Sequence, residues 1–507
     1  MLMPYPLEKK PYHLLEIIAF VCGLLLPFSF APYGLFWLQF PLLAYLFLIC
    51  LEQSPAIAFR RGFFFGLGWF VHGIHWLFYS LHFHGGMPAP IAVLTIVLLS
   101  AVLALFPAFS MYLINRHIKT SPLLMLVLVY PTGWVIFEWL RGYILTGFPW
   151  VQTGIAHIDT PLAGFAPLTG SLGVGLAAAI IAGLLAVSLL KIDAKSVFYK
   201  ISLPLVMGIY ASGFLLGFVQ WTQPVGKPIK ASLMQGNIAQ AEKWKRANRW
   251  PTMQMYRELT QKNWQSDLIV WPETALPGFR KGMSAYLKEL RVEAEKNSTD
   301  VLLGVFVRNQ QTRRYYNSVI TLDEQLYKKR HLVPLGEYFP FRPLLGFFSQ
   351  WVNIPMSDIE NGEAEQPLIK AAGQVIGVSI CFEDAFDRDI LRDLPEATML
   401  VNVSNDAWFE DSPEPWQHHQ IARMRALETG RTLLRATNTG VSSVIGPKGN
   451  VLAMSAQFKR EVLTLDVQGY EGGTPYVLWG NYLLISFAAV FLLVLGFKKS
   501  VSTEKAS

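Results

Sequence analysis

Three residues with complementary chemistry follow strand-like runs in the second half of the chain: Glu273 in "WPETALP", Lys329 in "YKKRHLVPLGEYFP" and Cys381 in "GVSICFEDAF". A thiol has a pKa of about 8.5 in water, so it needs a base before it becomes a nucleophile at neutral pH. A carboxylate in an enclosed pocket can accept that proton, and a lysine can stabilise the charge that develops on a carbonyl oxygen. Together these side chains could transfer an acyl group through a thioester.

Each of the three residues also has a simpler interpretation when it is taken alone. Glu273 could be a first-turn acid that complements a helix dipole, and Lys329 could belong to a solvated basic run before a loop. Cys381 could be a buried, unreactive thiol at the end of an apolar strand. The catalytic interpretation depends on all three leaving strands at the same edge of one sheet.

Apolar runs of strand length recur through this half of the chain. They lie at 266–271, 301–307, 317–322, 375–381, 398–404 and 441–447. Helical patterns lie between several of them, notably at 286–296 and 418–431. Most of the runs are continuously apolar, which indicates a sheet that is covered on both faces. The sequence therefore predicts an α/β sandwich.

The rest of the chain is more apolar than an ordinary soluble enzyme. The 507 residues are 52% hydrophobic and only 16% charged, with a mean hydropathy of +0.33. Stretches long enough to cross about 30 Å of hydrocarbon predict about eight membrane-spanning helices. They lie near 13–31, 34–51, 62–81, 89–115, 121–140, 168–190, 201–219 and 481–497. The predicted domains are a helical membrane domain at 1–221, an α/β domain at 222–475, and a last helix with a short tail at 476–507.

Short loops rich in lysine and arginine alternate with loops that carry almost none, so every basic loop falls on one side of the membrane. The basic residues of these loops and of the chain ends are Lys9, Lys10, Arg60, Arg61, Arg116, Lys119, Lys191, Lys195, Lys200, Lys498 and Lys499. Both termini are therefore predicted to be cytoplasmic, and the α/β domain extracytoplasmic. The net charge of +7 is largely this topological signal and does not indicate nucleic-acid binding.

The cysteines do not predict a disulfide. Cys22 and Cys50 lie in the first two predicted spans, where they are small apolar residues, so Cys381 has no partner in its own compartment. No cleavable signal peptide is expected, because the first apolar stretch lacks a small-residue cleavage site.

The motifs around Glu273, Lys329 and Cys381 resemble the three signatures of the nitrilase superfamily, in the same order and at suitable separations. This resemblance implies an αββα sandwich with Glu273 as the general base, Lys329 as the oxyanion stabiliser and Cys381 as the nucleophile. It also implies that Glu337, in "GEYFP", lies beside them as a second glutamate.

A nitrilase-like domain between the seventh and eighth spans is similar to the apolipoprotein N-acyltransferase family, and the resemblance covers essentially the whole chain. Supporting stretches are "MQGNIAQAEKW" at 234–244, "EWLRGYILTGFPW" at 138–150 and "NDAWFEDSPEPWQHHQIARMRALETGR" at 405–431. That family usually has tyrosine after the nucleophile, whereas this chain has Phe382 before Glu383. The change removes a hydroxyl and leaves the thiol intact.

The resemblance implies the last step of lipoprotein maturation. An acyl chain would pass from a phospholipid, usually from the sn-1 position of phosphatidylethanolamine, to the N-terminal α-amine of S-diacylglyceryl-cysteine in an apolipoprotein. The reaction would be ping-pong through a thioester, with no cofactor, metal or nucleic acid. The expected partners are the phospholipid donor, the diacylglyceryl-apolipoprotein acceptor and the bilayer, and the expected location is the bacterial inner membrane, with a periplasmic catalytic domain.

Several residues are candidates for contact with these substrates. They are Trp150, Trp244, Glu138, Arg141, Phe347, Phe348 and Trp351. Glu138 and Arg141 lie at the extracytoplasmic end of the fifth predicted span, where they could contact a headgroup or pair with each other. The aromatic segment at 341–355 could dip into the bilayer or pack as a helix in the domain core.

The histidines are weaker signals. The spacing of His72, His75, His82 and His84 would suit a metal, but without carboxylates or thiols nearby packing roles are favoured. His418 and His419, near the start of a predicted helix, have no evident partner in the sequence.

Two other functions remain open. One is a membrane-anchored amidase or nitrilase that hydrolyses a small amide or nitrile, which the three catalytic candidates alone do not exclude. The other is a transporter or scaffold with a decayed outer domain. The intact Glu273, Lys329 and Cys381 argue against decay, and the predicted membrane domain lacks the paired intramembrane charges typical of ion-coupled transport.

Overall fold

The computed structural model describes residues 12–190, 198–334, 336–338 and 359–504. The chain folds into two compact units. The first comprises Met1–His75, Val93–Val219 and Asn481–Ser507, and the second comprises Trp76–Ala92 and Gln220–Gly480.

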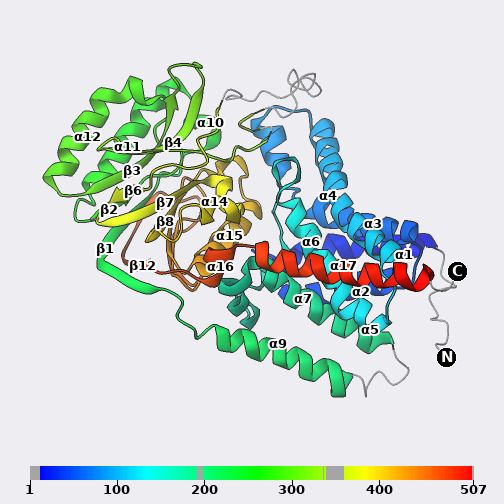
Figure 1. Ribbon diagram of the computed structural model, residues 1–507. Coiled ribbons are helices and arrows are strands. Elements are labelled where there is room, and N and C mark those ends of the chain that lie inside the picture. The colour runs from blue at the N-terminus through cyan, green and yellow to red at the C-terminus, as the bar shows by residue number, and fades with distance from the viewer. Residues whose placement is uncertain (1–11, 191–197, 335, 339–358, 505–507) are drawn as a thin grey trace. The chain divides into compact units, whose positions relative to one another are not determined.

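The first unit is helical (Figure 1). Its main helices are α1 (Tyr12–Leu25), α2 (Gln39–Cys50), α3 (Pro55–Gly73), α4 (Ala89–His117), α6 (Tyr130–Arg141), α7 (Ala166–Leu190), α9 (Leu203–Leu216) and α17 (Tyr482–Glu504). Among the described residues, three helical segments are long and apolar enough to cross a membrane: Ala89–His117, Pro122–Arg141 and Pro161–Leu190. Shorter apolar helices lie at His13–Ser29, Phe36–Cys50, Lys200–Leu216 and Tyr482–Phe497. These helices indicate a membrane protein, whereas the count of about eight spans stays a prediction.

The helix of the third predicted span, at 62–81, is displaced toward the N-terminus. It is α3, which begins directly after Ser54, whose side chain caps its first turn. Arg60 and Arg61, which the sequence analysis assigned to a loop, therefore lie within the helix. Arg60 is neutralised there by an ion pair to Glu16, with 2.6 Å between Nη2 and Oε1.

Within the described part of Gln220–Gly480, the strands form two six-stranded sheets. The first has the order β12 (Glu461–Glu471), β1 (Gln223–Gln235), β2 (Leu268–Val270), β3 (Asp300–Arg308), β4 (Tyr315–Thr321), β5 (Leu326–Lys328). The second has the order β11 (Val451–Met454), β10 (Ser443–Ile445), β9 (Thr432–Thr437), β8 (Met399–Ser404), β7 (Gln374–Ile380), β6 (Ile369–Ala371). Strands β1, β2 and β3 run parallel, as do β7, β8 and β9.

The two sheets pack face to face with helices outside them (Figure 1). Leu233 and Val270 of the first sheet share one buried core with Val378 and Val401 of the second. Helices α11 (Arg249–Gln261) and α12 (Ser284–Lys296) pack on the outer face of the first sheet, and α14 (Asp387–Leu391) and α15 (Glu414–Thr429) pack on the outer face of the second. The αββα sandwich predicted from the sequence is therefore confirmed.

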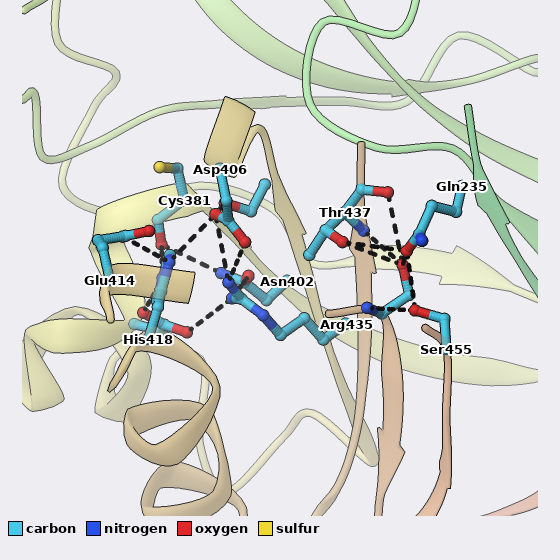
Figure 2. Close-up of polar contacts among 12 residues, drawn as sticks. Gln235, Cys381, Asn402, Asp406, Glu414, His418, Arg435, Thr437 and Ser455 are labelled. Carbon is cyan, nitrogen blue, oxygen red and sulfur yellow. Dashed lines mark hydrogen bonds and ion pairs between the residues drawn. The ribbon is translucent and has the colours of Figure 1, made fainter. Parts of the chain in front are cut away.

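Polar side chains tie the two sheets together where β1 and β9 end (Figure 2). Gln235, the last residue of β1, accepts hydrogen bonds at its Oε1 from Ser442 at 2.6 Å and from Ser455 at 2.8 Å. Thr437, the last residue of β9, donates to the same oxygen at 3.4 Å. The ends of central strands from both sheets thus meet in one region.

The segment Trp76–Ala92, which connects α3 to α4, belongs to the α/β unit. The Trp76 indole donates to Gln417 Oε1 at 3.3 Å, and His84 Nε2 lies 2.9 Å from Glu410 Oε1. The sequence predicts this segment as part of the membrane domain, because no local pattern indicates contacts between residues more than 300 positions apart.

Candidate active site

Cys381 lies at a sharp turn directly after β7. Its φ of 54° is in the left-handed region, which residues other than glycine rarely occupy. The turn continues into a short 3₁₀ helix, η13 (Cys381–Ala385). Two donors hold the Cys381 carbonyl oxygen: Asn402 Nδ2 at 3.2 Å and His418 Nε2 at 3.1 Å. The position of Cys381 is thus fixed by the hydrogen bonds to its carbonyl oxygen as well as by the preceding strand.

Glu383 joins this turn to the segment that carries Lys329. It is fully buried, at 0% exposure. Its Oε2 accepts from the Ile380 N–H at 2.7 Å and the Tyr327 hydroxyl at 2.9 Å, and its Oε1 accepts from the backbone N–H of residues 330 and 331 at 2.5 and 3.0 Å. Burial raises the pKa of Glu383 to about 7, although Lys329 and the backbone donors oppose the shift. This carboxylate therefore sets the distance between two catalytic candidates.

Replacing Glu383 with alanine is expected to lower the free energy of unfolding by about 3–5 kcal/mol, because buried backbone donors on two segments would lose their acceptor. The measurement is urea unfolding of the full-length protein in detergent, followed by intrinsic fluorescence. Glu365→Ala, at an exposed position, is the control and is expected to change stability by less than about 0.5 kcal/mol. Equal unfolding midpoints for the two variants would contradict this role of Glu383.

Glu273 follows β2 in a loop that lies against the backbone of β3. A Cβ atom on Gly304 of β3 would lie 2.4 Å from the Thr274 nitrogen and 2.8 Å from the Glu273 Cα, so only glycine allows this approach. Asn317 Nδ2 donates to Glu273 Oε1 at 2.6 Å and to Glu337 Oε1 at 3.1 Å. Asn317 thus holds the two glutamates side by side.

Lys329 lies between these two carboxylates. Its Nζ is 4.0 Å from Glu273 Oε1 and 2.9 Å from Glu337, and the side chain is only 1% exposed. Glu337 is held in turn by the Val333 N–H, 2.8 Å from its Oε2. The structure brings Glu273, Lys329 and Glu337 together, and Glu273 and Lys329 also act electrostatically on the Cys381 thiol. Their catalytic roles stay predictions.

The electrostatics of the site favour a protonated thiol and a charged lysine in the resting state. Burial, and secondarily Glu273, raise the pKa of Cys381 to about 12, and Lys329 and His418 only partly offset this. Burial also raises the pKa of Glu273, partly offset by Lys329. For Lys329, burial lowers the pKa but Glu337 and Glu273 raise it more, so the pKa is above its usual value.

Lys243 is a second buried cation at the site that the sequence analysis did not identify. Its Nζ donates to the Glu273 carbonyl oxygen at 3.1 Å. Burial lowers the pKa of Lys243 to about 8, although Glu273 and Cys381 favour its charged form. The neighbouring Trp244, a predicted substrate contact, lies with its ring 5.8 Å from that of Phe306.

Among the other predicted site residues, Phe382 packs edge-on against Phe386 at 5.0 Å. Glu138, Arg141 and Trp150 are buried together in the helical unit. Arg141 Nη2 is 3.7 Å from Glu138 Oε1, and Arg141 Nη1 donates to the Trp150 carbonyl at 2.7 Å. Of the two roles considered for this pair, the structure shows the mutual pairing. The predicted contacts Phe347, Phe348 and Trp351 lie outside the described residues.

The histidines singled out in the sequence have local partners. His72 Nδ1 contacts the Leu24 carbonyl at 2.6 Å, and His75 Nδ1 contacts the His72 carbonyl at 2.6 Å. His82 Nδ1 contacts the carbonyl of residue 87 at 2.7 Å, while His84 contacts Glu410, as described above. The expectation that no carboxylate lies nearby is therefore wrong for His84.

His418, for which the sequence shows no evident partner, also has carboxylates beside it. His418 is fully buried and lies 2.8 Å from Asp384 and 3.4 Å from Asp406. These carboxylates come from η13 and from η14 (Asp406–Trp408). The spacing of these residues along the sequence does not predict that the two carboxylates lie beside His418.

Comparisons with known proteins cover nearly the whole chain. The family model for the apolipoprotein N-acyltransferase N-terminal domain matches residues 22–184, and the model for carbon-nitrogen hydrolase matches residues 230–476. An apolipoprotein N-acyltransferase of Methylococcus capsulatus is 44% identical over 477 residues, covering 93% of this chain and 94% of the relative. One of Nitrosomonas europaea is 41% identical over 487 residues, covering 94% and 96%.

A solved carbon-nitrogen hydrolase from Helicobacter pylori G27 is similar to part of the chain. It is 17% identical, covers 47% of this chain and 88% of its own, and has a TM-score of 0.35. That score is too low to bear on the fold by itself.

Proposed function

Because the chain belongs to the apolipoprotein N-acyltransferase family and is an acyltransferase of lipoproteins, we propose that it works through a thioester on Cys381. The donor is a phospholipid, with the sn-1 chain of phosphatidylethanolamine as the first choice. The acceptor is the N-terminal α-amine of an S-diacylglyceryl-cysteine. The observation that carries the proposal is that Glu273 and Lys329, 4.0 Å apart, both act electrostatically on the Cys381 thiol.

In the first half-reaction the Cys381 sulfur attacks the ester carbonyl, and Glu273 accepts the thiol proton. Lys329 donates a hydrogen bond to the oxygen that becomes negative in the tetrahedral intermediate. The ester C–O bond then breaks, Glu273 returns the proton to the leaving alkoxide, and a lysophospholipid departs. The acyl chain is left on sulfur.

In the second half-reaction the neutral α-amine attacks the thioester carbonyl, and Glu273 takes a proton from the attacking nitrogen. The C–S bond breaks, an amide forms, and the thiol regains its proton. Water must be excluded from the site until the acceptor binds, because water would otherwise hydrolyse the thioester. The steps use only side chains of the chain and require neither a metal nor a cofactor.

For the location we propose the bacterial inner membrane, with about eight spanning helices, cytoplasmic termini and a periplasmic catalytic domain at about 222–475. The alternation of basic and uncharged loops supports this topology, although Arg60 and Arg61 lie within α3 rather than in a loop. The apolar helices support the membrane location. We retain Trp244, beside Lys243, as a substrate contact. The aromatic segment at 341–355 and the group of Glu138, Arg141 and Trp150 remain proposed contacts on the strength of the sequence.

The first test is the intact mass of the purified protein after incubation with a phosphatidylethanolamine that carries two different chains, without acceptor. We expect one acyl adduct that is sensitive to hydroxylamine, has the mass of the sn-1 chain and persists until a diacylglyceryl-cysteine peptide is added. An adduct with the sn-2 chain would change the proposed donor position. Loss of the adduct to water as fast as to peptide would instead favour the hydrolase that acts on a small amide or nitrile.

A further inference from the structure

A buried cluster of charged side chains lies next to the turn that carries Cys381 (Figure 2). Its members come from four elements: Asp384 from η13, Asp406 from η14, His418 from α15 and Arg435 from β9. Each is at most 1% exposed. A buried charge is costly unless it is paired, so the arrangement of these groups needs a reason.

His418 connects the cluster to the nucleophile. Its Nε2 lies 2.8 Å from Asp384 Oδ1 and 3.1 Å from the Cys381 carbonyl oxygen. Its Nδ1 lies 3.4 Å from Asp406 Oδ1 and 3.5 Å from Glu414 Oε1. Acceptors on both sides of the ring suit an imidazolium, in which both nitrogens carry a proton.

Asn402 is a second hydrogen-bond donor to the same carbonyl oxygen, and its side chain is itself held in place by Arg435. Asn402 Nδ2 donates to the Cys381 oxygen, and Arg435 Nη1 donates to Asn402 Oδ1 at 2.5 Å. The Cys381 carbonyl therefore has two donors whose own positions are fixed by buried charges. This matters because the left-handed backbone at Cys381 determines where its sulfur points.

The charges balance within the cluster. Arg435 Nη2 lies 3.1 Å from Asp406 Oδ2, and Arg435 Nη1 lies 3.4 Å from Asp384 Oδ2. Two cations thus face two carboxylates. Burial, together with the nearby Asp406, raises the pKa of Glu414 to about 7, so this third acid is half protonated near that pH and largely neutral only below it.

A metal ion is the other way to neutralise these groups. Oxygens of Asp406 and Glu414 and a ring nitrogen of His418 lie within 4.8 Å of one another. However, both Asp406 oxygens are already engaged, one by Ser404 at 2.5 Å and the other by Arg435. The contacts therefore favour the charged imidazole over a bound cation.

We infer that His418 is a positioning residue for the nucleophile: held as an imidazolium by Asp384 and Asp406, it fixes the Cys381 backbone through the carbonyl oxygen and adds positive charge beside the thiol. Burial and Arg435 oppose the charge, but Asp384 and Asp406 raise the pKa of His418 well above its usual value. Since an imidazole is charged below its pKa, His418 keeps its charge at neutral pH. The inference rests on the proposed role of Cys381.

The test compares His418→Gln with His419→Gln, which changes the next buried histidine of the same helix, in the full-length protein in detergent. Two rates are measured: formation of the acyl adduct from phosphatidylethanolamine, and alkylation of Cys381 by iodoacetamide across pH. For His418→Gln we expect adduct formation to slow by about 10²-fold with an unchanged KM, as for a misplaced reacting group. We also expect alkylation to slow by about tenfold at each pH, because loss of the charge raises the pKa of the thiol.

His419→Gln is expected to stay within twofold of wild type in both assays. Alkylation does not depend on acyl transfer, so it separates failure of this inference from failure of the proposed function. Wild-type rates in both assays, a changed KM alone, or faster alkylation from a merely loosened site would overturn the inference. Stoichiometric metal in the purified protein, with slower adduct formation after chelation, would overturn it in favour of a metal site.

If His418→Gln does not fold, Asp384→Asn provides the test. The amide retains hydrogen-bonding capacity beside His418 but removes one of the charges that sustain the imidazolium. We expect the variant to form adduct only in the pH range between the pKa of Glu273, below which the base is protonated, and the lowered pKa of His418, and to lose this activity as the pH rises through the latter. A pH profile with the wild-type shape would overturn the inference.

Discussion

Cys381→Ala is expected to abolish acyl transfer, with a loss of at least about 10⁴-fold, because no other group at the site can form the thioester. Cys381→Ser is expected to be equally inactive, since a hydroxyl is far harder to deprotonate than a thiol. Both variants are expected to fold, because the turn is held by Glu383, Asn402 and His418 rather than by the sulfur. The measurement is acylation of a diacylglyceryl-cysteine peptide, with the intact mass in parallel.

The matched control is Cys22→Ala, which removes a half-buried thiol from α1 in the helical unit. It is expected to leave transfer and the adduct mass unchanged. Acyl transfer by Cys381→Ala at the wild-type rate would end the proposed mechanism. An acyl adduct that still forms in Cys381→Ala would show that another residue carries the acyl group.

Glu273→Gln is expected to slow both half-reactions by about 10³-fold, because the amide is nearly isosteric but cannot accept a proton. The wild-type protein should lose activity as the pH falls through the pKa of Glu273, since the base is active only when deprotonated. Burial raises this pKa, so the loss should begin at a higher pH than for an exposed glutamate. The measurement is the single-turnover rate of adduct formation across pH, and then of transfer to peptide.

Two results would contradict the role of Glu273 as the base. One is a Glu273→Gln rate within tenfold of wild type. The other is the same acid-side loss of activity in the variant as in wild type, which would assign that ionisation to another group. Glu365→Gln, at an exposed position, is the control and should show the wild-type profile.

The sequence predicted the layers of the α/β unit because most central strands, such as β7 and β8, are continuous apolar runs that end at polar turns. It missed β12, most of whose residues are exposed or partly buried. It also missed β1, which contains proline and glycine and an irregularity between Val225 and Ile229. It also missed β9, because Arg435 places a charge in the middle of this buried strand. Asp384 and Asp406 neutralise the charge of Arg435, but this pairing is visible only in the folded chain.

Some residues of the candidate site could be identified from the sequence and others could not. Glu273, Lys329 and Cys381 could be named because each stands in a recognisable motif at the end of an apolar run. Asn317 has no motif of its own in the sequence. Its burial and its hydrogen bonds to Glu273 and Glu337 are seen only in the structure. The roles of Lys243 and His418 depend on contacts across 30 or more positions in the chain, and no local pattern records such contacts.

The segment Trp76–Ala92 bears on whether the catalytic sandwich can fold outside the full-length chain. Its chain comes from between α3 and α4, yet it packs on the α/β unit through Trp76, whose ring lies 4.9 Å from that of Phe409. A fragment cut at 220 and 480 would expose this aromatic surface and lose the partners of Gln417 and Glu410. Expression of the sandwich by itself, or its transplantation into another membrane scaffold, should therefore fail unless the segment is grafted with it.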